Sequence, residues 1–125
     1  MSLFQTRYSF EHRQQEASRV RSKYPDRIPI IVEKMQNANH SDTTVPNIKK
    51  NKFLVPSSFT MGELMFSIRK QIKLPSDKAM FIFVQKNLMP NSKMVSSVYE
   101  EYKDDDGFVY LTYCGESTFG CVHIK

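Results

Sequence analysis

The chain has 125 residues, of which 40% are hydrophobic and 25% are charged, as is typical of a single globular domain. The apolar runs are too short to span a bilayer and no signal-peptide core is present, so we expect a cytosolic protein. The net charge of +5 comes from the first 52 residues, with ten basic and five acidic residues against eight of each in the remainder. Such a basic half suits nucleic acid, anionic lipid, tubulin or an acidic peptide as a partner, or is simply a solvated surface.

The first predicted element is a helix over residues 10–24. Ser9 can cap its start, basic side chains gather in its last turn, and Pro25 stops it. A shorter helical turn is expected over residues 3–8. Residues 28–32 predict a strand with Pro29 near its beginning, because proline cannot donate a ladder hydrogen bond.

A long polar loop is expected over residues 33–51, followed by a short strand over residues 53–55. Pro56 closes this strand, and three lysines, at positions 49, 50 and 52, precede it. A short strand that begins beside lysines and ends in proline is typical of an exposed sheet edge.

The best-signalled helix covers residues 60–71, where Thr60 and Glu63 form a capping box and apolar residues recur at helical spacing. The pattern then predicts a strand at 79–84, a turn at 87–92, a short helix near 95–102 and a strand at 108–114. We interpret the acidic run at residues 104–106 as the solvated end of the short helix. A tail follows from residue 115.

No catalytic constellation is evident. The three histidines are scattered, and pairing His123 with Cys114 as a nucleophile, or with Cys121 as a metal site, matches no known spacing. Nucleotide-binding, phosphate-binding and zinc-protease motifs are absent from the sequence. We therefore expect a protein that is not an enzyme and has no cofactor and no metal site. Two cysteines do not make a disulfide framework, so reduced thiols are expected.

The element order from residue 28 onward is strand, strand, helix, strand, short helix, strand, which is the β-grasp order. Residues 23–34 (KYPDRIPIIVEK) and 52–56 (KFLVP) resemble the signature of the autophagy ubiquitin-like modifiers, the family of microtubule-associated protein light chain three and the GABA-receptor-associated protein. Shorter matches extend the resemblance from Phe10 to Gly120. It implies an α+β fold, a ubiquitin-like β-grasp with a four-stranded mixed sheet and two additional N-terminal helices.

The resemblance also implies a domain organisation. Residues 1–25 are expected to be a helical extension packed on the core, residues 26–116 the ubiquitin-like core, and residues 117–125 a flexible tail. By the same resemblance, a cysteine protease removes residues 121–125 by cutting between Gly120 and Cys121. Glycine has no Cβ, so a Phe-Gly tail can enter a narrow channel and expose its carbonyl group.

Activating and conjugating enzymes are then expected to join Gly120 to phosphatidylethanolamine. Phe81, Phe83 and Phe119 are the expected contacts with the processing and conjugation enzymes. The protein would be cytoplasmic, and on autophagosome membranes after lipidation, where it would act in autophagosome formation and as an adaptor for cargo receptors. The alternative is a basic module that is never lipidated and binds microtubules or nucleic acid. If the protein is lipidated, microtubules are still a candidate partner, but nucleic acid is not expected.

Ligands of the family carry an aromatic-x-x-aliphatic motif with acidic neighbours, which adds to the edge strand at residues 52–55. The positions that match the pocket for the aromatic residue are Glu16, Val20, Pro29, Lys50, Lys52, Leu54 and Phe108. Those that match the pocket for the aliphatic residue are Phe53, Val55, Pro56, Phe59 and Leu64. Phe59, Leu64 and Phe108 are also ordinary core residues, and the sequence alone favours that interpretation.

Four departures from the family pattern bear on ligand preference. Ser67 stands where an aliphatic residue usually lines the second pocket, and Gln71 replaces a basic residue. Gly107 replaces a non-glycine residue before Phe108, and the loop at residues 35–49 is several residues longer than usual.

Overall fold

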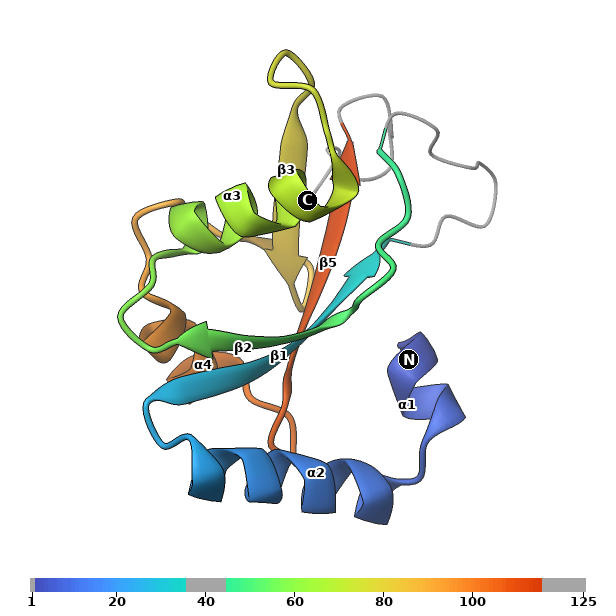
Figure 1. The fold of residues 1–125 in the computed structure, drawn as a ribbon, viewed down its shortest axis with the longest axis vertical. Helices are drawn as coiled ribbons and strands as arrows, with labels where there is room; N and C mark the ends of the chain where they lie inside the picture. The colour runs from blue at the N-terminus through green and yellow to red at the C-terminus, as the bar shows by residue number, and fades with distance from the viewer. Residues whose placement is uncertain (1, 36–44, 116–125) are drawn as a thin grey trace.

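The computed structural model describes residues 2–35 and 45–115. Predictions that concern Gly120, Cys121, Phe119, the tail and most of the long loop lie outside the described residues. The elements in chain order (Figure 1) are α1 (Leu3–Arg7), α2 (Phe10–Lys23), β1 (Arg27–Lys34), β2 (Lys52–Pro56), α3 (Met61–Ile72), β3 (Met80–Val84), β4 (Asn87–Leu88), α4 (Val95–Tyr102) and β5 (Val109–Gly115).

The strands form one mixed sheet in the order β2-β1-β5-β3-β4. β1 and β5 are parallel, while β2 pairs with β1, and β3 with β5 and β4, in antiparallel fashion. The last strand in the sequence therefore occupies the centre of the sheet. This arrangement, with α3 crossing between the first hairpin and β3, confirms the expected β-grasp with its two N-terminal helices.

The sheet has five strands rather than the expected four, because the chain turns back after β3 and pairs Asn87 and Leu88 with Val84 and Phe83. The turn uses Gln85 and Lys86, which adopt φ angles of 50° and 69°. Two-residue hairpins need positive φ at such positions and are usually signalled by Asn-Gly or Asp-Gly. Gln-Lys carries no such signal, so the sequence indicated a turn without the strand.

The helix starts follow the predicted caps. The Ser9 hydroxyl accepts the His12 N–H at 3.1 Å, and α2 begins at the next residue. In α3, the Glu63 N–H donates to the Thr60 hydroxyl at 3.2 Å while the Glu63 carboxylate accepts the Thr60 N–H at 2.8 Å. Ser2 and Gln5 form a second capping box at α1 that the sequence analysis did not identify.

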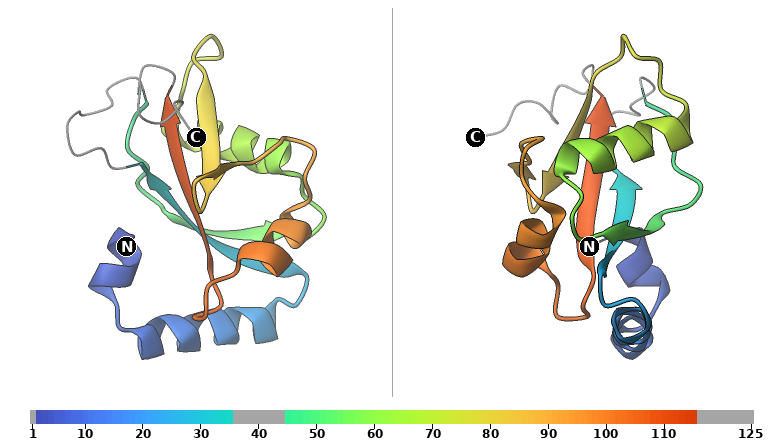
Figure 2. Two further views of the ribbon diagram at one scale, coloured as in Figure 1. Left: turned by 180° about the vertical axis from the view of Figure 1, so that it is seen from behind. Right: turned by 60° about the vertical axis from the view of Figure 1, so that its left-hand side comes forward.

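The helices cover the two faces of the sheet in different ways (Figure 2). Along β1, Ile28, Ile30 and Val32 face a large apolar cluster to which α3 and α4 contribute. Ile31, between them, faces a small cluster with Phe4, Ala17 and Phe108 under α1 and α2. Alternate residues of one buried strand thus serve two separate cores. Among the described helices, none is both long enough and apolar enough to cross a bilayer.

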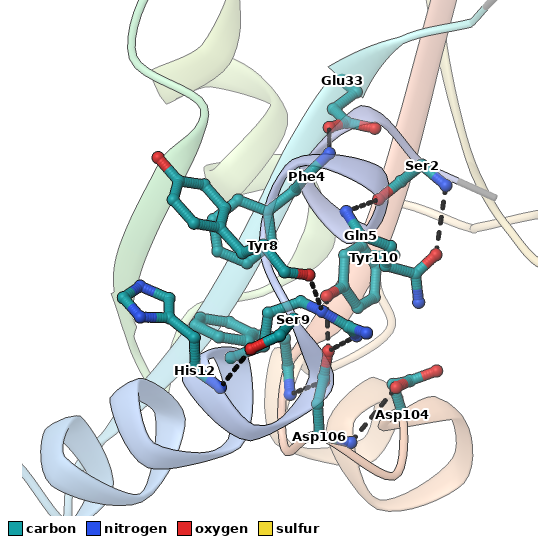
Figure 3. Close-up of polar contacts among 12 residues, drawn as sticks. Ser2, Phe4, Gln5, Tyr8, Ser9, His12, Glu33, Asp104, Asp106 and Tyr110 are labelled. Atoms are coloured by element: carbon teal, nitrogen blue, oxygen red, sulfur yellow. Dashed lines mark hydrogen bonds and ion pairs between the residues drawn. The ribbon is translucent and has the colours of Figure 1, made fainter.

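A buried ion pair joins α2 to the turn before β5. The Arg13 Nη1 donates to Asp106 Oδ2 at 2.5 Å, and the Tyr110 hydroxyl donates to the same oxygen at 2.6 Å (Figure 3). The other Asp106 oxygen accepts the Phe108 N–H at 2.9 Å, and Arg13 Nε donates to the Tyr8 carbonyl at 3.1 Å. The Arg13–Asp106 pair links α2 to the turn before β5, and the other three contacts hold its two partners in place.

The interpretation of residues 104–106 as a solvated helix end is therefore wrong for Asp106, which is only 1% exposed. Its burial is compensated by three donors and one positive charge, without which a buried carboxylate would be very costly. Within the described ranges, no group of His, Cys, Asp or Glu is arranged to hold a metal ion.

Burial is the largest single cause acting on the pKa values of this network, and hydrogen bonds act beside it. It raises the pKa of the Tyr110 hydroxyl, and the hydrogen bond to Asp106 raises it further. For Arg13, burial lowers the pKa of the guanidinium, but the hydrogen bonds to Asp106 and Tyr110 outweigh it, so the net shift is upward. Both shifts favour the protonated forms that donate to Asp106.

A third cluster contains the buried side chains of Phe83 and Cys114, with Phe81 and Met35 half-buried against them. Cys114 is disulfide-bonded, which differs from the reduced thiol that we expected. The sequence could not decide this point, because two cysteines are compatible with either state.

Candidate peptide-binding site

The backbone of β2 forms one edge of the sheet. The Val32 N–H donates to the Asn51 carbonyl at 2.8 Å, just beyond the ladder that joins Ile30 to Phe53 and Ile28 to Val55. In an antiparallel pair, hydrogen-bonded and non-bonded residue pairs alternate, so Lys52 and Leu54 direct their backbone groups away from β1. Two residues of β2 thus offer their main-chain donors and acceptors to an added strand.

Pro29 fits this alternation, because it lies opposite Leu54 and has no N–H to donate. Its place as the third residue of β1 agrees with the prediction that it lies near the strand start. The Leu54 carbonyl accepts a long hydrogen bond of 3.3 Å from the Arg27 guanidinium. That contact is exposed, so a bound chain can replace it.

An open hollow of about 590 Å³ lies between α2 and β2. It contains five of the seven residues expected at the aromatic anchor, Glu16, Val20, Lys50, Lys52 and Leu54, and also Phe53 from the set expected at the aliphatic anchor. Pro29 and Phe108 do not line the hollow; both are buried, and Phe108 packs with Phe4, Ala17 and Ile31. Their place is in the layer between the sheet and the N-terminal helices.

The hollow is more basic than the sequence indicated. Arg19, Lys23 and Arg27 line it together with the predicted Lys50. Sequence reasoning noted Arg19 and Lys23 at the end of a helix, where they complement its dipole, and did not place them or Arg27 beside the edge strand. Tyr24 and Gln71 also line it. The arrangement suits an apolar side chain flanked by negative charge.

An ion pair between Lys52 and Glu16 separates this hollow from a smaller one of about 370 Å³ near α1, since both residues line both hollows. Burial lowers the pKa of the Lys52 ammonium, whereas the adjacent Glu16 carboxylate favours its charged form. His12 lies 3.8 Å from the same carboxylate and stacks on Tyr8.

On the α3 side, the residues expected at the aliphatic anchor divide into two groups. Val55 and Leu64 are buried in the main core. Phe53 and Phe59 are half-buried against that core, and Pro56 ends β2. Phe53, Pro56 and Phe59 are therefore the members that a ligand can reach, while Val55 and Leu64 support them from below.

The expected enzyme contacts also differ in exposure. Phe81 is half-buried on β3 and Phe83 is fully buried. A partner can therefore contact the Phe81 ring directly, whereas Phe83 supports the surface from inside. Phe119 and Gly120 lie outside the described residues.

Comparison with known proteins places this geometry in a family. Residues 12–120 match the family model described as autophagy protein Atg8, ubiquitin-like. Autophagy-related protein 8e of Arabidopsis thaliana is 53% identical over 123 residues, which cover 98% of this chain and 97% of that protein. Autophagy-related protein 8 of Pichia angusta is 50% identical over 119 residues, which cover 95% and 91%.

The fold agrees with a solved relative, the crystal structure of Trypanosoma brucei ATG8. The two structures superpose with a TM-score of 0.87 at 38% sequence identity, over 96% of this chain and 99% of that one. The family resemblance expected from the KYPDRIP and KFLVP blocks is thereby confirmed. The chain belongs to the Atg8 family of ubiquitin-like autophagy proteins.

Proposed function

We propose that the β2 edge binds peptides with an aromatic-x-x-aliphatic motif by strand addition. The observation that carries this proposal is the position of β2. It is an edge strand of the sheet, and a hollow adjoins it on the α2 side. An extended peptide gains backbone hydrogen bonds at Lys52 and Leu54, and its side chains reach alternate sides of the added strand.

The chemistry of the two sides assigns the anchors. The aromatic residue enters the α2-side hollow between Val20 and Leu54, where apolar walls are surrounded by cations. The aliphatic residue packs on the half-buried Phe59 beside Pro56. Acidic residues next to the motif pair with Lys50 and the basic residues of α2, with exposed pairs contributing up to about 1 kcal/mol each.

The second part of the proposal concerns the tail. A cysteine protease cuts between Gly120 and Cys121, and activating and conjugating enzymes join the Gly120 carboxyl group to the amine of phosphatidylethanolamine. Support comes from family membership and from the family match, which ends at Gly120. The conjugate is a membrane-bound adaptor, not an enzyme, that moves from the cytoplasm to the autophagosome membrane and recruits cargo receptors.

The peptide site is tested by titrating the ¹⁵N-labelled protein with an acidic Trp-x-x-Leu peptide. The backbone resonances of Lys52–Pro56 and of the middle of α2 should shift. Leu54→Ala should weaken binding about tenfold, because it removes half-buried apolar surface from the hollow wall without touching the core. Shifts confined to other surfaces would refute the site, and a steep loss of binding with salt would instead favour a basic module for polyanions.

The tail is tested with Gly120→Ala in a cell or a reconstituted conjugation system. The variant should fold normally and stay off membranes, whereas the parent protein should float with them. The two acyl chains provide the anchoring, at about 0.8 kcal/mol per buried methylene. Flotation of Gly120→Ala with autophagic membranes would exclude conjugation at this residue.

A further inference from the structure

The outer side of α3 carries a second apolar hollow, of about 600 Å³, at the end of the edge-strand groove. Its wall exposes mainly apolar surface. The residues that line it are Phe59, Thr60, Gly62, Glu63, Phe66, Ser67, Asn91 and Ser92. None of the predicted anchor positions except Phe59 belongs to it.

Phe66 is the most exposed large hydrophobic residue in the described part of the chain, at 65%. Single exposed apolar side chains are common and need no explanation. Phe66 differs because its ring borders a hollow that already contains a second phenylalanine, Phe59. Two aromatic rings on one open concavity provide a surface that an apolar side chain can fill.

Ser67 connects this hollow to the groove. It stands where the family pattern has an aliphatic residue lining the second pocket, and here it lines the outer hollow. Its hydroxyl donates to the Glu63 carbonyl at 3.3 Å, so its polar capacity is used within α3. A small side chain at this position leaves space in the hollow that Phe59 and Phe66 also line.

The far wall of the hollow is fixed. The Gly62 N–H donates to the Asn91 carbonyl at 2.9 Å, and a Cβ added at Gly62 would lie 3.3 Å from Asn91 Cβ. The Met61 N–H donates to the Lys93 carbonyl at 2.8 Å in the same contact. A wall held by backbone hydrogen bonds loses little freedom when a ligand binds.

We propose that Ser67 and Phe66 form a third anchor subsite, which takes an apolar side chain of the same peptide C-terminal to its aliphatic anchor. This proposal rests on the proposed function of the β2 edge. The occupant follows from continuity, because Phe59 belongs to the expected aliphatic anchor and also lines the outer hollow together with Phe66 and Ser67. Phe66 lies five residues after the start of α3 at Met61, or about 7.5 Å along the helix, which two or three residues of extended chain can span, so the third anchor lies two or three positions after the aliphatic residue.

The test compares two peptides that differ at one position. Both carry an acidic flank and Trp-x-x-Leu; one continues with x-x-Phe and the other with x-x-Ser. Isothermal titration should show the Phe peptide binding the parent protein about three- to tenfold more tightly, as expected for partial burial of one aromatic ring. Equal affinities would overturn the third subsite while leaving the groove intact.

Protein variants then show which residues are responsible for the gain in affinity. Phe66→Ala should bring the Phe peptide to the affinity of the Ser peptide and leave the Ser peptide unchanged. Leu88→Ala, an exposed apolar residue on the opposite edge strand, is the matched control and should change neither affinity. A gain that survives Phe66→Ala would place the third anchor elsewhere, and failure of both peptides to bind the parent would contradict the groove and the subsite together.

Discussion

The two faces of the sheet are held to their helices by different kinds of contact. On the α3 and α4 face, twenty buried apolar side chains form one continuous cluster in the described part of the chain. On the α1 and α2 face, the corresponding cluster has four, and the contact is completed by Arg13, Asp106, Tyr110 and Glu33. The first attachment is spread over many residues, whereas the second is concentrated in a few polar groups.

This difference predicts how each face responds to substitution. An apolar cluster loses stability in small amounts, because each side chain contributes a fraction of the buried area. A buried polar network loses much at once, since removing one partner leaves the others desolvated and unpaired. The N-terminal helices, which provide one wall of the proposed groove, therefore depend on a single cluster.

The largest effect is expected for Asp106→Ala. It leaves the Arg13 guanidinium, the Tyr110 hydroxyl and the Phe108 N–H without their shared acceptor, and should lower the free energy of unfolding by about 3–5 kcal/mol. Urea denaturation measures the loss. Asp105→Ala, at an exposed neighbour, is the control and should change stability by less than about 0.5 kcal/mol. Similar losses for both variants would show that the network does not hold the face.

A smaller loss, about 1.5 kcal/mol, is expected for Tyr110→Phe, which removes one donor to a buried carboxylate. The effect should depend on pH. Because the pKa of Tyr110 is raised in the folded state, its contribution is complete below its ordinary value of 10.0 and decreases as the pH rises toward the folded value. The stability difference between parent and variant should therefore be constant up to about pH 10 and shrink above it. If the stability difference instead grew above pH 10, the pKa of Tyr110 would be lowered rather than raised by folding.

On the apolar face, Thr60→Ala removes the side-chain cap of α3 and should cost about 1 kcal/mol. The large cluster should keep α3 in place, so the proposed groove should still bind peptide. Thermal unfolding and peptide titration together measure both expectations. If Thr60→Ala abolished peptide binding at so small a cost in stability, the position of α3 would depend on a few residues, as the position of α2 does.

The smallest global effect is expected for Glu33→Gln. The Glu33 carboxylate accepts the N–H groups of Leu3 at 3.2 Å and Phe4 at 2.9 Å, and thereby fixes the start of α1. Loss of its charge should lower overall stability by about 0.5 kcal/mol and speed hydrogen exchange of the α1 amides selectively. If hydrogen exchange became equally faster across the whole sheet, α1 would not open independently of the rest of the fold.

The sequence allowed the regular elements to be predicted because their signals are local. The α3 capping box, the Ser9 cap and the Pro56 strand end each depend on residues within four positions of one another. Asp106 was misassigned because its partner, Arg13, is 93 residues away in the sequence. An acidic run followed by glycine is locally identical whether it is solvated or paired.

The candidate site was predicted in part for the same reason. The edge strand was recognisable from its lysines and proline, and the family resemblance indicated Glu16, Val20, Lys50, Lys52 and Leu54 but not the cations of α2 that line the same hollow. The apolar hollow at Phe66 depends on Asn91 and Ser92, which approach α3 from a distant turn. Phe108 is buried behind the α2-side hollow because it packs against Phe4 of α1. The sequence pattern of α2 gives no indication of this contact.

The central position of β5 has a mechanical consequence. This strand ends at Gly115, five residues before Gly120, and runs parallel to β1, which in turn pairs with β2. If cargo is held at β2 and the tail is fixed to a membrane as proposed, tension between them passes along the strands through both ladders. All hydrogen bonds of a ladder then bear the load together in shear, instead of opening one after another. The protein would therefore resist a sustained pull better than a fold in which the same hydrogen bonds opened one after another.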